Sequence, residues 1–326
     1  MNLRLVSALP GEHGRISVVV FNAAGDLLLV GAGRQTTLWG LSAGDGPVAR
    51  GAVRPGTGPQ SVTTAGFHPG QPVVATNGGR MRVASVWEYP GSGPIRSLYV
   101  HRWYDRSTAF ATGDVSAAFA LAFRPGTGML ATGHAGGRLR MWDLGEPASP
   151  QKLTETKIKA PTVDALAFSP DGAFLACPDR RGAVFVWQVT ERGRLSLAQT
   201  LETNNGRARW LRYSTDGRLL AASTVGGVCL WDLHEPRRRE PVAHLARDRV
   251  RPGVWRSTDF HPSEPLAATG DTRGGVAFWD VSDPYHPSLL AEGAVHRKAV
   301  TTLAFGPDGR HLATGCKDGT ASLWTL

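Results

Sequence analysis

The sequence predicts an all-β fold in which seven units of four antiparallel strands close into a ring. Three observations predict it: one strand–turn–strand pattern recurs seven times, each copy ends in a tryptophan, and turn residues are frequent. The 326 residues include 40 glycines and 22 prolines, which indicate many turns, and 41% apolar residues, which indicate a packed core. We therefore expect residues 1–326 to form one large β-domain.

Each repeat is a strand ending in an aromatic residue, a first turn, a second strand, a second turn, and a strand ending in tryptophan. The aromatic residue and the tryptophan are 18 to 20 residues apart, and successive tryptophans are 44 to 55 residues apart. The aromatic residues are Phe21, Phe67, Phe123, Phe168, Tyr213, Phe260 and Phe305. The tryptophans are Trp39, Trp87, Trp142, Trp187, Trp231, Trp279 and Trp324. We expect each tryptophan to pack its large face against the neighbouring sheet.

The turns within the repeats have recognisable chemistry. The first turns "SPDG" at 169–172, "STDG" at 214–217 and "GPDG" at 306–309 combine residues that favour tight hairpins. The second turns include "HAGG", "TVGG", "TRGG" and "CKDG", where glycine tolerates positive φ. Both turns of a repeat are therefore short, as stacked hairpins require.

The ends of the repeats carry a known signature. "MWDL" at 141–144, "LWDL" at 230–233 and "FWDV" at 278–281 contain a Trp-Asp pair, and "LWGL", "VWEY", "VWQV" and "LWTL" are variants. The chain resembles the WD-repeat β-propeller family over essentially its whole length, and its proline-rich connections look like those of actinobacterial WD-repeat domain proteins. The resemblance implies a seven-bladed β-propeller of four-stranded antiparallel blades in a bacterial protein.

The resemblance also implies a buried tetrad in which a His, a Ser or Thr, an Asp and the Trp are hydrogen-bonded. Only the last repeat has all four residues: His296, Thr314, Asp318 and Trp324. We therefore expect most blades to depend on apolar packing rather than on polar networks.

The last repeat has only three strands, so its outer strand must come from elsewhere. The segment "LRLVSAL" at 3–9 precedes the first full repeat and is a surplus strand. An unpaired strand at 320–326 would be an open sheet edge that invites aggregation. We expect residues 3–9 to pair with it and to close the ring.

The sequence has no motif for phosphate-loop, dinucleotide, zinc-protease or serine-hydrolase chemistry. Its three cysteines, Cys177, Cys229 and Cys316, have no CxxC spacing, which favours a reducing compartment. No run approaches the roughly 18 apolar residues of a membrane helix. We expect a cytoplasmic monomer with no cofactor, no metal and no membrane contact, and more readily a binding protein than an enzyme.

The net charge of +9 is concentrated in certain loops. By the family geometry, the second turns and the connections between blades lie on one face, here called the second-turn face. We count 17 basic residues in these loops: Arg15, Arg34, Arg80, Arg106, Arg138, Lys157, Lys159, Arg180, Arg181, Arg207, Arg247, Arg249, Arg251, Arg273, Arg297, Lys298 and Lys317. Seven acidic residues oppose them: Glu12, Asp105, Asp114, Asp179, Asp248, Asp271 and Asp318. An alternative is that arginine-rich loops reflect codon bias and are only solvated.

Three tryptophans, Trp103, Trp210 and Trp255, are not explained by the repeat. All three fall near loops that enter an innermost strand, and Trp103 is followed by Tyr104. They are either packed locally or form an aromatic rim around the channel mouth. Together with arginine, exposed aromatic residues have the composition of interface hot spots.

The favoured function is a protein-interaction scaffold that docks an acidic partner on the second-turn face. The predicted partner-binding residues are Arg34, Arg80, Trp103, Tyr104, Arg138, Arg180, Arg181, Trp210, Arg249, Arg251, Trp255, Arg273, Arg297 and Lys317. One alternative is nucleic-acid binding by the same face, since cations contact phosphates and aromatic rings stack on bases. Another is an enzyme or small-ligand binder at the channel mouth, with Trp210 and Trp255 lining a pocket and Asp271 or His134 as polar groups.

Overall fold

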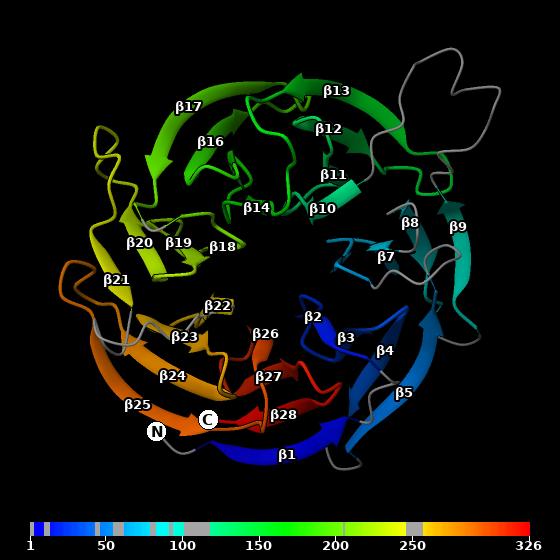
Figure 1. The fold of residues 1–326 in the computed structure, drawn as a ribbon. Coiled ribbons are helices and arrows are strands. Elements are labelled where there is room, and N and C mark those ends of the chain that lie inside the picture. The colour runs from blue at the N-terminus through cyan, green and yellow to red at the C-terminus, as the bar shows by residue number, and fades with distance from the viewer. Residues whose placement is uncertain are drawn as a thin grey trace.

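A computed structural model of the chain describes residues 3–9, 14–42, 46–54, 62–78, 83–90, 94–100, 118–204, 206–245 and 257–326. Seven four-stranded antiparallel sheets are arranged as the blades of a ring, and no helix occurs among these residues (Figure 1). The prediction of a seven-bladed β-propeller is therefore confirmed.

The strands of a blade follow one another from the centre of the ring to its rim (Figure 1). Blade 1 consists of β2(Ile16–Phe21), β3(Leu27–Ala32), β4(Gln35–Ser42) and β5(Gly46–Val53). Blade 2 consists of β6(Thr64–Phe67), β7(Val73–Gly78), β8(Val83–Glu88) and β9(Arg96–Val100). Blade 3 consists of β10(Ala118–Phe123), β11(Met129–His134), β12(Arg138–Asp143) and β13(Gln151–Lys157). Blades 4 and 5 consist of β14(Ala167–Phe168), β15(Phe174–Pro178), β16(Ala183–Val189), β17(Leu195–Glu202); and β18(Trp210–Tyr213), β19(Leu219–Thr224), β20(Gly227–Asp232), β21(Ala243–Leu245). Blade 6 consists of β22(Ser257–Phe260), β23(Leu266–Gly270), β24(Gly275–Asp280), β25(Ser288–Ala294).

Blade 7 combines the two ends of the chain. Its strands are β26(Val300–Phe305), β27(His311–Cys316), β28(Ala321–Thr325) and, outermost, β1(Arg4–Leu9). β1 pairs antiparallel with β28 from Arg4 opposite Thr325 to Leu9 opposite Ala321. The N- and C-termini lie close together in Figure 1. The predicted closure of the ring by the N-terminal strand is confirmed.

The buried apolar residues form seven clusters, one at each junction between neighbouring blades. Each repeat tryptophan packs at the junction with the preceding blade: Trp231 lies between blades 4 and 5, and Trp39 between blades 7 and 1. The blades are held together by these side chains, because adjacent sheets share no strand. This is why a bulky aromatic residue recurs once per repeat.

Apolar packing predominates at the blade junctions, as expected, but four blades also contain a polar bond at the repeat tryptophan. The indole N–H donates to a threonine hydroxyl in four blades: Trp87 to Thr76 at 2.9 Å, Trp142 to Thr132 at 2.7 Å, Trp279 to Thr269 at 2.9 Å and Trp324 to Thr314 at 2.8 Å. These four hydroxyl groups are on the second strand of each blade and are buried. A buried indole N–H needs such an acceptor, and a threonine about ten residues before the tryptophan supplies it.

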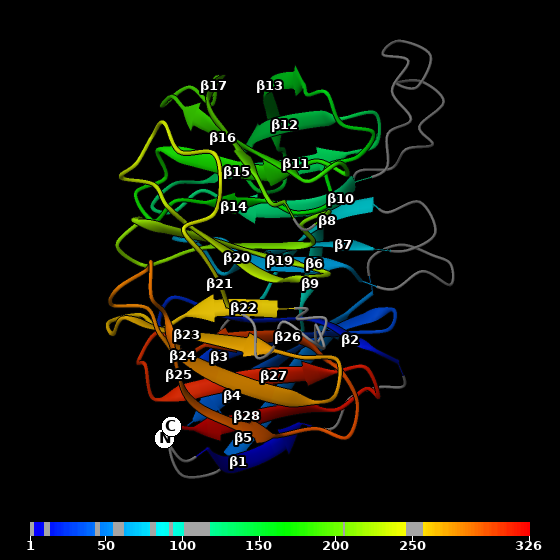
Figure 2. The same ribbon diagram turned by 60° about the vertical axis from the view of Figure 1, so that its left-hand side comes forward.

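The order of the antiparallel strands divides the loops between two faces of the disc. The second turns and the connections between blades lie at one end of the strands, and the first turns lie at the other (Figure 2). Four of the described first turns end in glycines with positive φ: Gly25 at 78°, Gly172 at 68°, Gly217 at 74° and Gly309 at 69°. The described residues contain no helix long and apolar enough to cross a membrane.

Candidate functional site

The predicted partner-binding residues fall into two groups. Eight belong to described loops and strand ends on the second-turn face: Arg34, Arg138, Arg180, Arg181, Trp210, Arg273, Arg297 and Lys317. Six lie outside the described residues: Arg80, Trp103, Tyr104, Arg249, Arg251 and Trp255. The described part of the candidate site therefore consists of the first group.

The acidic residues of the second turns are occupied by their own backbone. Asp179 accepts hydrogen bonds from the N–H groups of Arg181 and Ala183, both at 2.8 Å. Asp271 accepts equivalent bonds at 2.9 and 2.6 Å from Arg273 and Gly275. These carboxylates hold the second turns in shape, and neither forms an ion pair with a described cation of its own turn.

Asp318 of blade 7 also accepts hydrogen bonds from a residue of its own turn. Burial opposes its ionisation, but hydrogen bonds from the Thr320 hydroxyl at 2.6 Å and the Thr320 N–H at 3.0 Å outweigh that effect. They lower the pKa of Asp318 from 3.8 to about 2. The carboxylate is therefore ionised throughout the physiological range.

The four residues proposed as a tetrad are connected, but through a fifth residue. Trp324 Nε1 donates to Thr314 Oγ1, which lies 2.8 Å from His296 Nε2. The other ring nitrogen of His296 lies 3.2 Å from Thr320 Oγ1, and Thr320 in turn donates to Asp318. The chain of bonds is complete when His296 is neutral and carries its proton on Nδ1, and burial lowers the pKa of His296 in keeping with that form.

A second polar cluster lies on the second-turn face at the junction of blades 4 and 5. The Asp164 carboxylate forms an ion pair with Arg207 and lies 3.8 Å from Arg180 Nε. Arg180 Nε also donates to the Thr162 hydroxyl at 2.9 Å, and Thr162 donates to Asp164 at 3.0 Å. One carboxylate thus holds two guanidinium groups, which leaves one positive charge in excess at this junction.

Among the predicted partner-binding residues, five described cations are exposed and have no side-chain ion pair with any described residue: Arg34, Arg181, Arg273, Arg297 and Lys317. Arg138 differs, because its Nε lies 3.9 Å from Glu155 Oε1. The buried Arg140 also binds Glu155, at 2.8 Å, and is a structural partner that the sequence did not single out.

The innermost strands surround a central cavity of about 1260 Å³. Trp210 borders this cavity, whereas Asp271 and His134, considered as polar groups of a channel pocket, do not. His134 Nε2 instead lies 2.8 Å from the Thr132 hydroxyl. Among the residues that the structure describes, no group of three or more His, Cys, Asp or Glu side chains could hold a metal ion.

The cavity wall contains an ion pair that was not predicted from the sequence. Arg212 Nε lies 2.9 Å from Asp259 Oδ1, across the junction of blades 5 and 6. Both residues directly precede the aromatic residue of their repeat, a position held by Val20, Gly66, Ala122, Ala167 and Ala304 in the other blades. When the repeats are aligned, Arg212 and Asp259 are therefore two charged residues at a position that otherwise holds small or apolar residues.

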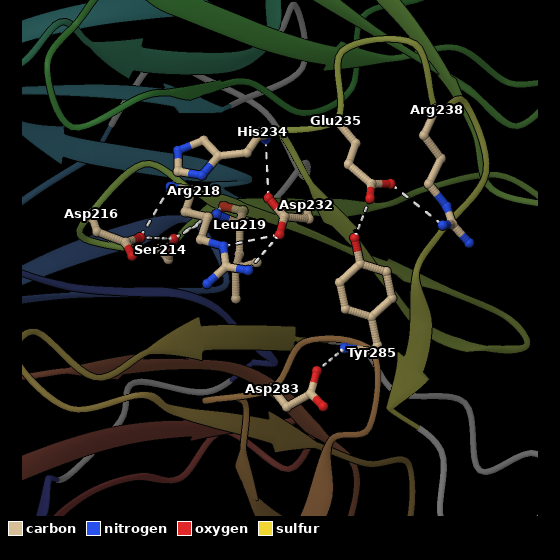
Figure 3. A network of polar contacts seen from close by, with 10 residues as sticks. All are labelled: Ser214, Asp216, Arg218, Leu219, Asp232, His234, Glu235, Arg238, Asp283 and Tyr285. Atoms are coloured by element: carbon tan, nitrogen blue, oxygen red, sulfur yellow. Dashed lines mark hydrogen bonds and ion pairs between the residues drawn. The ribbon is translucent and has the colours of Figure 1, made fainter.

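Blades 5 and 6 are also linked on the first-turn side (Figure 3). Tyr285, in the connection between β24 and β25, donates its hydroxyl hydrogen to Glu235 Oε1 at 2.5 Å. Glu235 lies in the connection between β20 and β21 and also binds Arg238 at 3.4 Å, while Arg218 binds Asp232 at 2.7 Å. Both acid–base pairs lie within blade 5, and Tyr285 joins the Glu235–Arg238 pair to blade 6 through its bond to Glu235 and through its ring, over which the Arg238 guanidinium lies at 5.8 Å.

Comparison with known proteins supports the repeat type. A family model described as "WD domain, G-beta repeat" matches residues 288–325, which run from β25 to β28. The match includes Trp324 and the second turn of blade 7. It covers the blade whose signature residues are the most complete.

Several curated proteins are similar over much of the chain. A guanine nucleotide-binding protein subunit beta of Zea mays is 24% identical over 221 residues, which cover 64% of this chain and 55% of that protein. The target of rapamycin complex subunit wat1 of Schizosaccharomyces pombe is 25% identical over 190 residues, covering 57% of this chain and 58% of that protein. The WD repeat-containing protein 90 of Xenopus tropicalis is 26% identical over 196 residues, covering 60% of this chain and 10% of that protein.

The matched region spans less than two thirds of each of these relatives. Together with the family match, they support the WD40 repeat family. The three organisms are eukaryotes, so the likeness to actinobacterial proteins remains a prediction.

Proposed function

We propose that this chain, a propeller of WD-type repeats, is a protein-interaction scaffold whose second-turn face docks an acidic protein segment. The observation that carries the proposal is the set of exposed cations in the second turns and blade connections, represented by Arg181, Arg273, Arg297 and Lys317. These side chains have no ion-pair partner within the described chain, while nearby turn carboxylates already accept backbone hydrogen bonds. An acidic segment would supply the missing anions.

The physical basis is electrostatic complementarity on a rigid surface. A cluster of exposed cations makes the electrostatic potential above that face positive, which speeds association with an anionic partner. At physiological ionic strength this attraction reaches about 8 Å from the surface. Asp179 and Asp271 fix the backbone of the short second turns, so binding has to order the cationic side chains but not the turns that carry them.

The names of two relatives agree with a role in assembly. One is named as the beta subunit of a guanine nucleotide-binding protein and the other as a subunit of a complex. We extend from them only the general role of binding a protein partner. We further propose a cytoplasmic monomer, in keeping with buried free thiols at Cys177, Cys229 and Cys316.

The test compares two variants with the same change in charge. The face variant carries Arg181→Glu, Arg273→Glu, Arg297→Glu and Lys317→Glu, and the control variant carries Arg192→Glu, Arg194→Glu, Arg237→Glu and Arg239→Glu. The control residues are exposed and lie in the connections from β16 to β17 and from β20 to β21, on the first-turn side. Binding of a fluorescent Asp/Glu-rich peptide is measured by anisotropy at several salt concentrations.

We expect the face variant to lose peptide binding by at least about tenfold, and the control variant to keep most of it. Equal losses in both variants would show that net charge alone acts, and would refute the docking face. Single-stranded DNA is titrated in parallel. Tighter binding of DNA with a steeper salt dependence than that of the peptide would assign the face to nucleic acid instead.

A further inference from the structure

The central cavity offers a set of hydrogen-bond donors that the scaffold function does not use. Arg209, Trp210 and Arg212 follow one another along the innermost part of blade 5, and all three border the cavity. Such a run occurs in none of the other innermost strands, whose sequences are mostly apolar or small. The donors are therefore a local feature of blade 5 rather than a feature of the repeat.

Trp210 has a buried polar atom without a partner. Its indole N–H is buried and makes no hydrogen bond, as is also true of Trp187, whereas the indole groups of Trp87, Trp142, Trp279 and Trp324 each donate to a threonine. Trp210 differs from Trp187 in that it borders the central cavity. A buried donor left unpaired costs about 1–3 kcal/mol, so it calls for an acceptor. Trp210 borders the cavity, so a rotation of its ring would bring the N–H to an acceptor bound there.

The alternation of side chains along β18 determines which side of the strand Trp210 and Arg212 face. Leu211 and Tyr213 pack into the cluster between blades 4 and 5. Side chains alternate along a strand, so Trp210 and Arg212 project from its other side. The contact of Arg212 with Asp259 of blade 6 agrees with this direction.

The charges of the cavity wall favour an anion. Its described charged residues are four arginines, Arg15, Arg207, Arg209 and Arg212, and two aspartates, Asp164 and Asp259. Both carboxylates are engaged, since Asp164 binds Arg207 and Asp259 binds Arg212 and, at 2.9 Å, the N–H of Phe305. Arg209 is exposed and its guanidinium has no partner among the described residues.

We propose that the channel beside Arg209, Trp210 and Arg212 binds a small organic polyanion, a molecule that carries phosphate or carboxylate groups. Guanidinium and indole groups donate hydrogen bonds and accept none, so their ligand must be rich in acceptor oxygens. The cavity is large enough for a small molecule, and the Trp210 ring gives its carbon skeleton an apolar surface. The proposal does not depend on docking at the second-turn face.

The test uses inorganic pyrophosphate and citrate as probes, which separate phosphate from carboxylate chemistry. Binding is measured by titration calorimetry at constant ionic strength, and the indole N–H signal of Trp210 is followed by ¹H–¹⁵N NMR. The Trp210→Phe variant, which keeps an aromatic ring, identifies that signal by its absence. We expect at least one probe to shift the Trp210 signal below about 1 mM.

Two arginine variants with the same change in charge complete the test. Arg209→Gln removes an exposed cavity cation, and we expect it to weaken binding about tenfold. Arg239→Gln removes an exposed cation of the β20–β21 connection outside the cavity, and we expect unchanged binding. The proposal is overturned if neither probe moves the Trp210 signal, or if Arg239→Gln weakens binding as much as Arg209→Gln does.

Discussion

At the scale of single residues, the Arg212–Asp259 pair shows how a charge can be kept inside a propeller. Asp259 is largely buried, and burial raises its pKa above 3.8 although the Arg212 guanidinium and the Phe305 N–H act in the opposite direction. Its ionised form therefore depends on Arg212. Arg212 is less dependent on Asp259, because its side chain is 34% exposed while that of Asp259 is 13% exposed.

This asymmetry predicts unequal effects of the two single substitutions. We expect Arg212→Ala to lower the free energy of unfolding by about 2 kcal/mol, and Asp259→Ala by about 1 kcal/mol, because only the first leaves a buried charge without its partner. The double variant restores small residues, as in the other five blades, and we expect it to be no less stable than Arg212→Ala. Arg209→Ala is the matched control and should have little effect. Urea denaturation measures all four variants.

The same pair predicts a dependence on pH. A group whose folded pKa is raised contributes stability at low pH that is lost as the pH rises through the folded value. Without Arg212 the pKa of Asp259 rises further, so the cost of Arg212→Ala should be smaller at about pH 5 than at about pH 8. A cost that is equal at both pH values would show that Asp259 does not need its partner to remain charged.

Thr314 predicts a second effect at this scale. Its hydroxyl bonds to two rings, those of Trp324 and His296, whereas the hydroxyl of Thr269 bonds to one ring, that of Trp279. Each hydroxyl also lies 3.5 Å from a backbone carbonyl, that of Ser322 for Thr314 and that of Ala277 for Thr269. Valine has nearly the same shape without the hydroxyl. We expect Thr314→Val to cost about 2–3 kcal/mol and Thr269→Val about 1 kcal/mol, because the first leaves two polar groups unpaired. If urea denaturation gives equal losses, the bond from Thr314 to His296 adds nothing to blade 7 beyond the indole bond that both blades share.

The sequence identified some of these residues and not others for a physical reason. The repeat tryptophans could be predicted because they recur at the same position of every repeat, whichever residues they contact. The Thr320 link to His296 was missed because it depends on side-chain geometry in one turn. The Arg212–Asp259 pair joins residues of two different repeats, and only the closed ring brings them together.

At the scale of strands and loops, repeat periodicity predicted the order of strands well. A short, largely buried strand followed by a Pro/Asp/Gly turn has few other solutions, and the register places every repeat tryptophan at a blade junction. Blade 5 departs from the pattern. Its outer strand β21 has only three residues, and the preceding connection carries the Arg237–Arg239 run.

That departure is compensated by contacts that no repeat pattern contains. The carbonyl of Arg239 accepts hydrogen bonds from the Glu202 N–H of blade 4 at 2.8 Å and from Trp231 Nε1 at 3.1 Å. On its other side the connection binds blade 6 through Glu235 and Tyr285 (Figure 3). The connection between β20 and β21 thus supplies contacts to the neighbouring blades in place of those that a longer outer strand would make.

At the scale of the whole molecule, one strand carries the closure of the ring. β1 covers the edge of β28 with five paired positions, and Leu9 is buried in the cluster between blades 7 and 1. Leu5 and Val6, in contrast, are 49% and 46% exposed. The contribution of β1 therefore comes from its backbone pairing and from Leu9 rather than from its outward side chains.

Removal of residues 1–9 should accordingly expose the edge of β28 and open the junction beside Leu9, with unfolding or association through that edge as the result. Size-exclusion chromatography with light scattering and a thermal melt measure both outcomes, and a synthetic peptide of residues 1–9 should restore part of the lost melting temperature. The matched control replaces Leu5 and Val6 with serine and should remain monomeric and folded, because these side chains are already in water. A truncated chain that stays monomeric with an unchanged melting temperature would show that the seven junction clusters hold the ring without its closing strand.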